Sequence, residues 1–168
     1  MNRHVLRPEY SVAALNARAP GHLPGWFGIE VLGVEPGRLN SRLSIRPEML
    51  APNGFLHAAT VVALADTSAG YATFAHLPVG AVGFTTVELK TNFLGTLTRG
   101  VLLCAATAVH SGRTTQVWDA EVSSEDGRRL ALFRCTQMIL WPLPIPGAGS
   151  TDRSGQVMRN STKEERDG

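Results

Sequence analysis

Alternating hydrophobic and polar positions predict a pair of strands near the start of the chain. Between Arg38 and Arg46, apolar or small residues alternate with polar ones, which is typical of a strand with one buried and one solvated face. The stretch 26–37 predicts a first strand that ends at a Pro-Gly turn, and the Pro- and Gly-rich stretch 20–25 predicts a loop before it. The two strands are therefore expected to form a hairpin.

A helix is predicted from about His57 to His76, between an irregular Pro-containing connection and Pro78. Almost every face of this segment is apolar, which indicates a helix buried all round rather than one lying on a surface. Four strand-like runs with Gly-containing turns between them follow it, at 84–95, 101–110, 114–125 and 128–141. The Asp-Gly pair before the last run is a strong hairpin signal.

This order of elements predicts an α+β fold in which an antiparallel sheet of about six strands wraps a long buried helix. One sheet leaves part of such a helix uncovered, so a second subunit is expected on the remaining face. We divide the chain into an N-terminal extension (1–19), one folded domain (20–141) and a polar tail (142–168) that we predict to be mostly disordered.

Composition excludes several classes of function. The net charge is only +2, and 18% of the 168 residues are charged, so no strong field recruits nucleic acid or a membrane surface. Cys104 and Cys135 lie in apolar runs without metal-ligand spacing, which indicates reduced, buried thiols and no zinc site. No apolar stretch has the length of a signal peptide or a membrane span, so we predict a cytoplasmic protein.

The stretch from Asn53 to Ala72 contains one carboxylate, Asp66, among alanine, valine, leucine and small hydroxyl residues. Burying even a neutral polar group without a partner costs roughly 1–3 kcal/mol by mutational estimates, and a charge costs more. Asp66 therefore either pairs with another group inside the core or takes part in chemistry.

The start of the predicted helix offers a complementary group. Asn53, Gly54 and His57 precede helix N–H groups that have no partner within the helix and lie at the positive end of its dipole. The small residues Ala58 and Ala59 allow a carbonyl oxygen to approach these donors, which would stabilise negative charge developing on that oxygen.

Taken together, these motifs resemble the hotdog-fold acyl-CoA thioesterases, and most closely the branch of the phenylacetyl-CoA and 4-hydroxybenzoyl-CoA thioesterases. The resemblance spans about 53–140. It is carried by Asn53-Gly54-x-x-His57, Asp66 nine residues after that histidine, Gly70-Tyr71-Ala72, and the stretches TTVELKTNFLGT and HSGRTTQVWDAEV. The chain departs from the family's His-Gly-Gly turn, because alanines follow His57, and Ala51 stands where the family commonly has an amide.

The resemblance implies hydrolysis of an aryl- or medium-chain acyl-CoA. Asp66 would be the nucleophile or the general base, the amides of Ala58 and Ala59 would form the oxyanion hole, and His57 would brace the turn. In the same way, Asn53 is a candidate for positioning the carbonyl or water. Thr86, from the partner's strand, is a candidate for holding the water, although a threonine in a strand is often only a good strand former.

The resemblance also implies that Lys90, Arg99, Arg113 and Thr114 contact the phosphates of coenzyme A, which is part of the substrate. No separate cofactor and no metal are expected. A homodimer with active sites at the subunit interface, paired into a tetramer, is the expected assembly. A non-catalytic acyl-CoA sensor is the main alternative, and a hotdog dehydratase is a weaker one because Asp66 has no helical His nearby.

Overall fold

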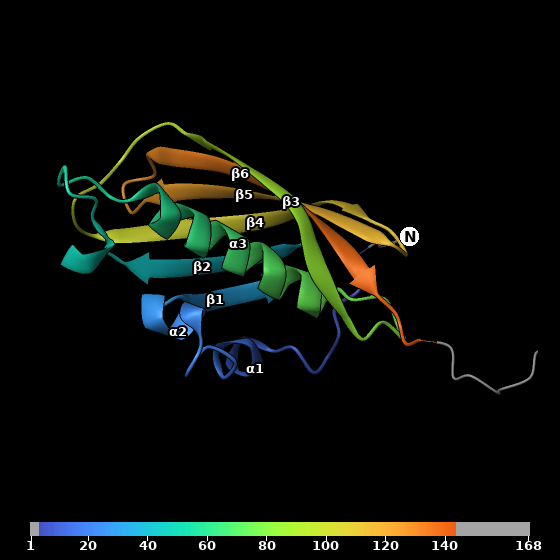
Figure 1. The fold of residues 1–168 in the computed structure, drawn as a ribbon. Coiled ribbons are helices and arrows are strands. Elements are labelled where there is room, and N and C mark those ends of the chain that lie inside the picture. The colour runs from blue at the N-terminus through green and yellow to red at the C-terminus, as the bar shows by residue number, and fades with distance from the viewer. Residues whose placement is uncertain (1–3, 144–168) are drawn as a thin grey trace, which may run out of the picture.

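The structure, a computed structural model that describes residues 4–143, is one six-stranded antiparallel sheet with a long helix along one face (Figure 1). The strand order is β1-β2-β4-β5-β6-β3. The elements are α1 (Val12–Asn16), α2 (Leu23–Phe27), β1 (Glu30–Glu35), β2 (Arg38–Ser44), the 3-10 turn η1 (Pro47–Met49), α3 (Ala58–Ala75), β3 (Gly83–Phe93), β4 (Val101–Ser111), β5 (Thr115–Ser124) and β6 (Arg129–Leu140). The predicted α+β arrangement, with six strands and one long helix, is confirmed.

The alternation along the chain correctly predicts which strand faces are buried. In β2, Leu39, Ser41 and Leu43 are buried against the helix side, while Arg38 and Arg42 are exposed. The predicted β1–β2 hairpin forms, and the Asp-Gly turn between β5 and β6 places Gly127 at a φ of +82°, a conformation that favours glycine.

The segment before β1 differs from the prediction. Leu23–Phe27 forms the short helix α2, although 20–25 was predicted as a loop and 26–37 as strand. Pro24 lies in the first turn, where its missing N–H is not needed, and Gly28 ends the helix in the left-handed conformation with a φ of +71°. Pro and Gly therefore begin and end a single helical turn here instead of only interrupting the chain.

Helix α3 begins and ends at the histidines that bounded the prediction, with His57 as its N-cap and His76 as its C-cap. Its small side chains allow close packing on the sheet, where the hydroxyl oxygens of Ser68 and Ser41 on β2 lie 2.6 Å apart. The opposite side of the helix is only half-buried in the single chain. It includes Val62, Ala63, Asp66, Thr67 and Gly70. The predicted need for further cover over α3 agrees with this exposure.

The main core lies between α3 and the inner face of the sheet, and both cysteines are there as buried free thiols, as predicted. Trp118 is fully buried and donates its indole N–H to Gln116, 3.0 Å away. The amide of Gln116 in turn donates to the main-chain oxygen of His76 at 2.8 Å. This chain of hydrogen bonds holds the C-terminal end of α3 against β5.

The two edges of the sheet differ in whether their backbone groups have hydrogen-bond partners. At the β1 edge, the side chain of Asn16 makes two hydrogen bonds to the backbone of Val31, of 2.8 and 3.0 Å, and so satisfies a strand edge as another strand would. The β3 edge has no neighbour among the described residues, and β3 exposes 59% of Val87, 43% of Leu89 and 50% of Phe93. An open edge with exposed apolar residues is typical of an interface.

The stretch predicted as an N-terminal extension contains α1, whose Leu15 lies in the core. The predicted polar tail lies outside the described residues from residue 144 onward. Of the helices within 4–143, none has the length and apolar content to cross a bilayer.

Candidate active site

The turn that leads into α3 is held by backbone hydrogen bonds and by one short polar side chain. Asn53 accepts a hydrogen bond from the N–H of Phe55 at 3.2 Å, and Gly54 adopts a φ of +83°. The main-chain oxygen of Met49 accepts from the N–H of His57 at 3.0 Å and from the hydroxyl of Thr60 at 3.1 Å. These contacts fix where the helix begins, and Asn53 acts in the structure as a turn former.

The first turn of α3 leaves one N–H group free. His57 accepts a hydrogen bond from the N–H of Ala59 through its Nδ1 atom at 3.0 Å, so its ring caps the helix. The N–H of Thr60 donates to the main-chain oxygen of His57 at 2.9 Å. Among the described residues, the N–H of Ala58 has no partner, and it points out of the positive end of an 18-residue helix.

The two alanines fit this turn without strain. Ala58 and Ala59 are the first two residues of α3, so both adopt the helical backbone conformation that alanine readily takes, and the positive φ angles lie at glycines elsewhere in the described chain. Alanine has the highest intrinsic helix propensity, so the departure from the family's glycines favours the helix start. Both residues are exposed, which leaves their N-terminal side open to a ligand.

Asp66 lies in the middle of α3 on its half-buried side. Its Oδ1 atom is buried and has no hydrogen-bond partner in the described part of the chain. Burial raises the pKa of this carboxyl above its ordinary value, because desolvation disfavours the charged form. The negative charge of Asp66 in turn contributes to the raised pKa of the Cys135 thiol on β6. The carboxylate is therefore not part of a structural ion pair within 4–143.

Thr86 lies on β3 beside α3. It pairs with Gln137 of β6 next to an irregularity in the β3–β6 register, and it is exposed in the single chain. Gln137 is fully buried, and its carbonyl oxygen is another side-chain atom without a partner in the described residues.

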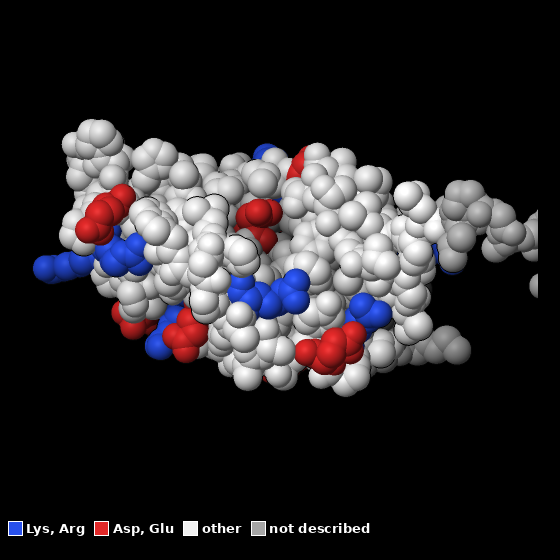
Figure 2. Space-filling view, turned by 60° about the horizontal axis from the view of Figure 1, so that its bottom comes forward, with Lys and Arg blue, Asp and Glu red and all other residues white. Residues whose placement is uncertain are grey.

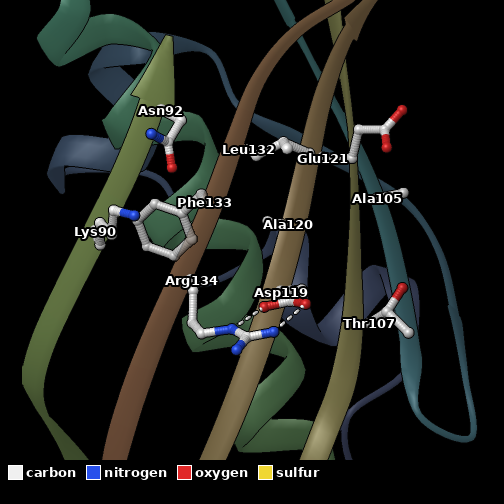
Figure 3. Close-up of a pocket in the computed structure, with 10 residues that line it drawn as sticks. All are labelled: Lys90, Asn92, Ala105, Thr107, Asp119, Ala120, Glu121, Leu132, Phe133 and Arg134. Atoms are coloured by element: carbon white, nitrogen blue, oxygen red, sulfur yellow. Dashed lines mark hydrogen bonds and ion pairs between the residues drawn. The ribbon is translucent and has the colours of Figure 1, made fainter.

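The four residues predicted to contact coenzyme A do not come together within one chain. Arg99 precedes β4, whereas Arg113 and Thr114 follow it, so the eleven residues of β4 separate them by about 35 Å at ~3.3 Å per residue. The guanidinium of Arg113 lies 4.6 Å from the ring centre of Trp141. Lys90 points to the opposite face of the sheet from α3, where it lines a hollow of about 560 Å³ (Figure 3).

That outer hollow contains an ion pair between Asp119 and Arg134, with two N–O distances of 2.5 and 2.7 Å (Figure 3). Directly opposite positions on β5 and β6 bring the two side chains together. This pair was not predicted, because the register of the two strands is not visible in the sequence.

Charge is distributed without a dominant sign. In the face shown in Figure 2, basic and acidic side chains are interspersed and no large basic patch is present. Within residues 4–143, no cluster of three or more His, Cys, Asp or Glu side chains has the geometry to hold a metal ion.

Comparison with known proteins identifies the family. The family model described as "Thioesterase superfamily" matches residues 53–131, which contain both the helix start and Asp66. The 1,4-dihydroxy-2-naphthoyl-CoA hydrolase of Listeria monocytogenes is 30% identical over 110 residues, covering 66% of this chain and 89% of that protein. The proofreading thioesterase EntH of Klebsiella pneumoniae is 28% identical over 132 residues, covering 79% and 96%.

Solved structures give the same result for the fold. A variant of thioesterase PA1618 from Pseudomonas aeruginosa superimposes with a TM-score of 0.77 at 26% identity, covering 81% of this chain and 98% of that one. The predicted hotdog fold and the predicted family are thereby confirmed. The chain belongs to the thioesterase superfamily and is a thioester hydrolase built on the hotdog fold.

Proposed function

We propose that this protein hydrolyses an aryl- or medium-chain acyl-CoA to the free acid and coenzyme A, with Asp66 as its general base or nucleophile. The observation that carries the proposal is a half-buried carboxylate whose buried Oδ1 atom has no partner among the described residues, on the same helix that presents a free N–H at its positive end. Such a pair supplies the two functions that thioester hydrolysis needs, namely attack on the carbonyl carbon and stabilisation of the oxyanion.

The N–H of Ala58 is the proposed oxyanion donor. The N–H of Ala59, predicted as a second donor, is occupied by the ring of His57, so one amide and the helix dipole act on the thioester oxygen. His57 serves to hold this geometry. Removal of a single donor of this kind costs about 3–4 kcal/mol of transition-state stabilisation in measured cases.

Asp66 can act in two ways that differ in where the new bond forms. As a base, its carboxylate takes a proton from water while the water oxygen attacks the carbonyl carbon. The carbon–sulfur bond then breaks, and the thiolate of coenzyme A receives the proton. As a nucleophile, the carboxylate itself attacks and expels the thiolate, and water then hydrolyses the resulting mixed anhydride. The raised pKa of Asp66 is compatible with either route.

One chain cannot place both groups on the same carbonyl. Asp66 lies eight residues after Ala58, which is about 12 Å along a helix at ~1.5 Å per residue. Both groups must lie about 3 Å from the reacting atoms. We therefore infer a homodimer in which Asp66 of one chain works with Ala58 of the other, formed over the open β3 edge and its exposed apolar residues.

We propose roles in this dimer for the remaining predicted residues. Thr86 on β3 would reach the partner's site, and Asn53 would shape the entrance turn. Lys90, Arg99, Arg113 and Thr114 are proposed to meet the nucleotide phosphates through contributions from different chains, because β4 separates them within one. Pairing of dimers into a tetramer and a cytoplasmic location remain part of the proposal, and no resident cofactor is called for.

An aromatic acyl group is supported by two observations. Phe74 and Phe84 pack edge to face with ring centres 4.8 Å apart, and Phe84 lies against Gly70, one helical turn from Asp66. In addition, the Listeria relative is named for hydrolysis of a naphthoyl-CoA. These aromatic side chains would form an apolar wall beside the carboxylate.

Release of coenzyme A thiol from a panel of aryl- and alkyl-acyl-CoAs tests the proposal. Wild type is compared with Asp66→Asn, and with Glu35→Gln as a control in which an exposed carboxylate at the far end of β1 is neutralised. Hydrolysis by wild type and the control, but not by Asp66→Asn, supports the proposal. Binding of acyl-CoA without hydrolysis by wild type would contradict it and favour the alternative of an acyl-CoA sensor.

A further inference from the structure

We propose that Gln137 on β6 is a positioning residue for Asp66, whose carboxyl its side-chain amide holds from the sheet side. This inference rests on the proposed function and deepens it. Gln137 is fully buried, and its carbonyl oxygen Oε1 has no hydrogen-bond partner among the described residues. The same is true of the buried Oδ1 atom of Asp66. Buried side-chain oxygens without partners are rare in folded proteins, so each of them requires an explanation.

Gln137 differs in this respect from the glutamine beside it. Gln116 on β5 pairs with Gln137, and both side chains are buried on the inner face of the sheet. Gln116 uses both ends of its amide, since it donates to the main-chain oxygen of His76 and accepts from the indole of Trp118. Gln137 uses only its nitrogen, which donates to the sulfur of Cys135 over 3.3 Å. Its amide therefore extends along β6 toward Cys135 and carries a carbonyl oxygen that no described residue uses.

The rotation of α3 directs Asp66 toward the β6–β3 side of the sheet. Ser68 faces β2 at the other side, where its hydroxyl oxygen lies 2.6 Å from that of Ser41. Asp66 lies two residues before Ser68, which is about 200° around an α-helix, so it points away from β2. Gly70, one turn after Asp66, lies against the ring of Phe84 on β3. The face of α3 that carries Asp66 is therefore the face that lies over β6 and β3.

The position along α3 sets Asp66 level with Gln137. Phe84, which lies against Gly70, pairs with Ile139 of β6. Asp66 precedes Gly70 by one helical turn, about 6 Å, which equals about two residues of strand. Because α3 and β6 run in the same direction (Figure 1), the residue of β6 level with Asp66 is two before Ile139, which is Gln137.

The thiol of Cys135 locates the carboxyl independently of this count. The negative charge of Asp66 contributes to the raised pKa of Cys135, so the two groups lie near each other. The sulfur of Cys135 also accepts the N–H of Gln137. The Asp66 carboxyl and the Gln137 amide are therefore both neighbours of one sulfur atom in the layer between α3 and β6.

Among the described residues, no charged side chain competes for Asp66 in this layer. Burial is the main cause that raises the pKa of Cys135 to about 12 and that of Cys104 on β4 to about 11, so both thiols stay neutral. Glu88 lies on the outer side of β3, where it accepts a hydrogen bond from Thr136 at 2.6 Å. Burial also raises the pKa of Asp66, and no ion pair within 4–143 includes this residue. A neutral amide is therefore the polar partner that the sheet offers.

An amide suits a carboxyl group in both of its protonation states. When Asp66 is neutral, an O–H on Oδ1 donates to Oε1 of Gln137, while the amide nitrogen donates to Cys135 as in the structure. When Asp66 is ionised, rotation of the amide by half a turn presents an N–H to Oδ1 and turns Oε1 toward the S–H of Cys135. Gln137 itself neither gains nor loses a proton.

A carboxyl held at Oδ1 keeps its other oxygen in a fixed direction. Asp66 as a whole is only half-buried, and its Oδ2 atom is not enclosed as Oδ1 is. Oδ2 is therefore the oxygen that attacks the carbonyl carbon or takes the proton from water, on the side of α3 where the second subunit is expected. Fixing its direction matters because catalysis depends strongly on the alignment of the reacting atoms.

The first test compares Gln137→Met, which keeps the length of the side chain and removes both ends of the amide, with wild type. Ser41→Ala is the matched control, because it removes one hydroxyl of the buried Ser41–Ser68 pair on the opposite side of α3. We expect kcat to fall about 10- to 100-fold in Gln137→Met with little change in KM, as for loss of a hydrogen bond to a charged group. The control should keep the kcat of wild type.

The second test does not depend on turnover. Gln137→Glu has nearly the shape of the native side chain and brings a second carboxyl to Asp66. Carbon-detected NMR titration of the Asp66 carboxyl, assigned by its absence in Asp66→Asn, should show one step in wild type and two steps in Gln137→Glu. Two carboxyls in contact titrate as a coupled pair, whereas distant ones titrate separately.

The outcomes separate the role of Gln137 from general packing and from the proposed function. An unchanged kcat in Gln137→Met, or a single step for Asp66 in Gln137→Glu, would overturn the role of Gln137. An equal loss of kcat in Ser41→Ala would also overturn it, because any damage to the packing of α3 would then explain the effect. If wild type hydrolyses no thioester, the proposed function fails, while the titration still decides whether Gln137 contacts Asp66.

Discussion

Asp66→Asn is predicted to make the protein more stable while it abolishes activity. In the folded chain the carboxylate is half-buried, its Oδ1 atom has no partner within residues 4–143, and burial raises its pKa. Asparagine has nearly the same shape but no charge, so the variant avoids the desolvation of an anion. We expect a gain of about 1 kcal/mol in the free energy of unfolding at pH 7, which is about 2–4 °C in Tm for a chain of this size.

The pH dependence of this difference has a defined sign. Because the folded-state pKa is raised, folded Asp66 binds its proton more tightly than the unfolded chain does. Wild type therefore loses stability as pH rises from the ordinary carboxyl pKa of 3.8 through the higher folded value, and Asp66→Asn does not. The advantage of the variant should disappear at acid pH and reach a plateau near neutrality.

Urea unfolding at matched protomer concentration, followed by circular dichroism at several pH values, measures this difference. Glu35→Gln, an exposed carboxylate, should show no comparable gain. Loss of 1 kcal/mol or more in Asp66→Asn at pH 7 would contradict this prediction and would mean that the carboxylate is a structural partner in the core.

Three further predictions follow from the caps, the sheet edges and a buried histidine. His57→Ala should lower the free energy of unfolding by about 1 kcal/mol, since Ala59 loses its capping acceptor, and His57→Asn should recover most of it in thermal melts. Val87→Asp should weaken dimerisation at least tenfold in sedimentation experiments, whereas Leu32→Asp, an apolar residue with 47% exposure on the covered β1 edge, should not. Burial lowers the pKa of His76, so its contribution to stability should be complete above its ordinary pKa of 6.5 and be lost as pH falls from 6.5 through the lower folded value. Acid unfolding of wild type compared with a His76→Gln variant would detect this loss. Identical unfolding curves on the acid side would contradict the prediction.

Much of the fold was visible in the sequence because alternation and helix caps are local signals. The strand faces of β2, the Asp-Gly hairpin and both ends of α3 were predicted correctly for this reason. Helix α2 was missed because Pro24 was interpreted as a sign of a loop and Gly28 as part of the first strand, although the two residues are suited to begin and end one helical turn.

The site was only partly accessible to such reasoning. Asp66 could be found because a charge in an apolar helix is conspicuous, and the helix start could be found from its small residues. That His57 occupies the N–H of Ala59 depends on a side-chain rotamer, which the sequence does not encode visibly.

The most direct test of the shared site is complementation between two inactive variants. Ala58→Pro removes the proposed oxyanion donor, and proline is well suited to this position because it is the first residue of α3 and His57 before it is extended. Asp66→Asn removes the carboxylate. Each variant alone should be inactive, and both should remain folded.

Mixed under conditions that allow subunit exchange, the two variants form heterodimers that contain one intact site if Asp66 and Ala58 act across the interface. We expect recovery of about one quarter of the wild-type acyl-CoA hydrolysis after complete exchange of equal amounts, because half of the dimers are then heterodimers with one intact site of two. Absence of recovery, with heterodimers demonstrated by mass spectrometry, would contradict the shared site and with it the proposed arrangement of catalytic groups.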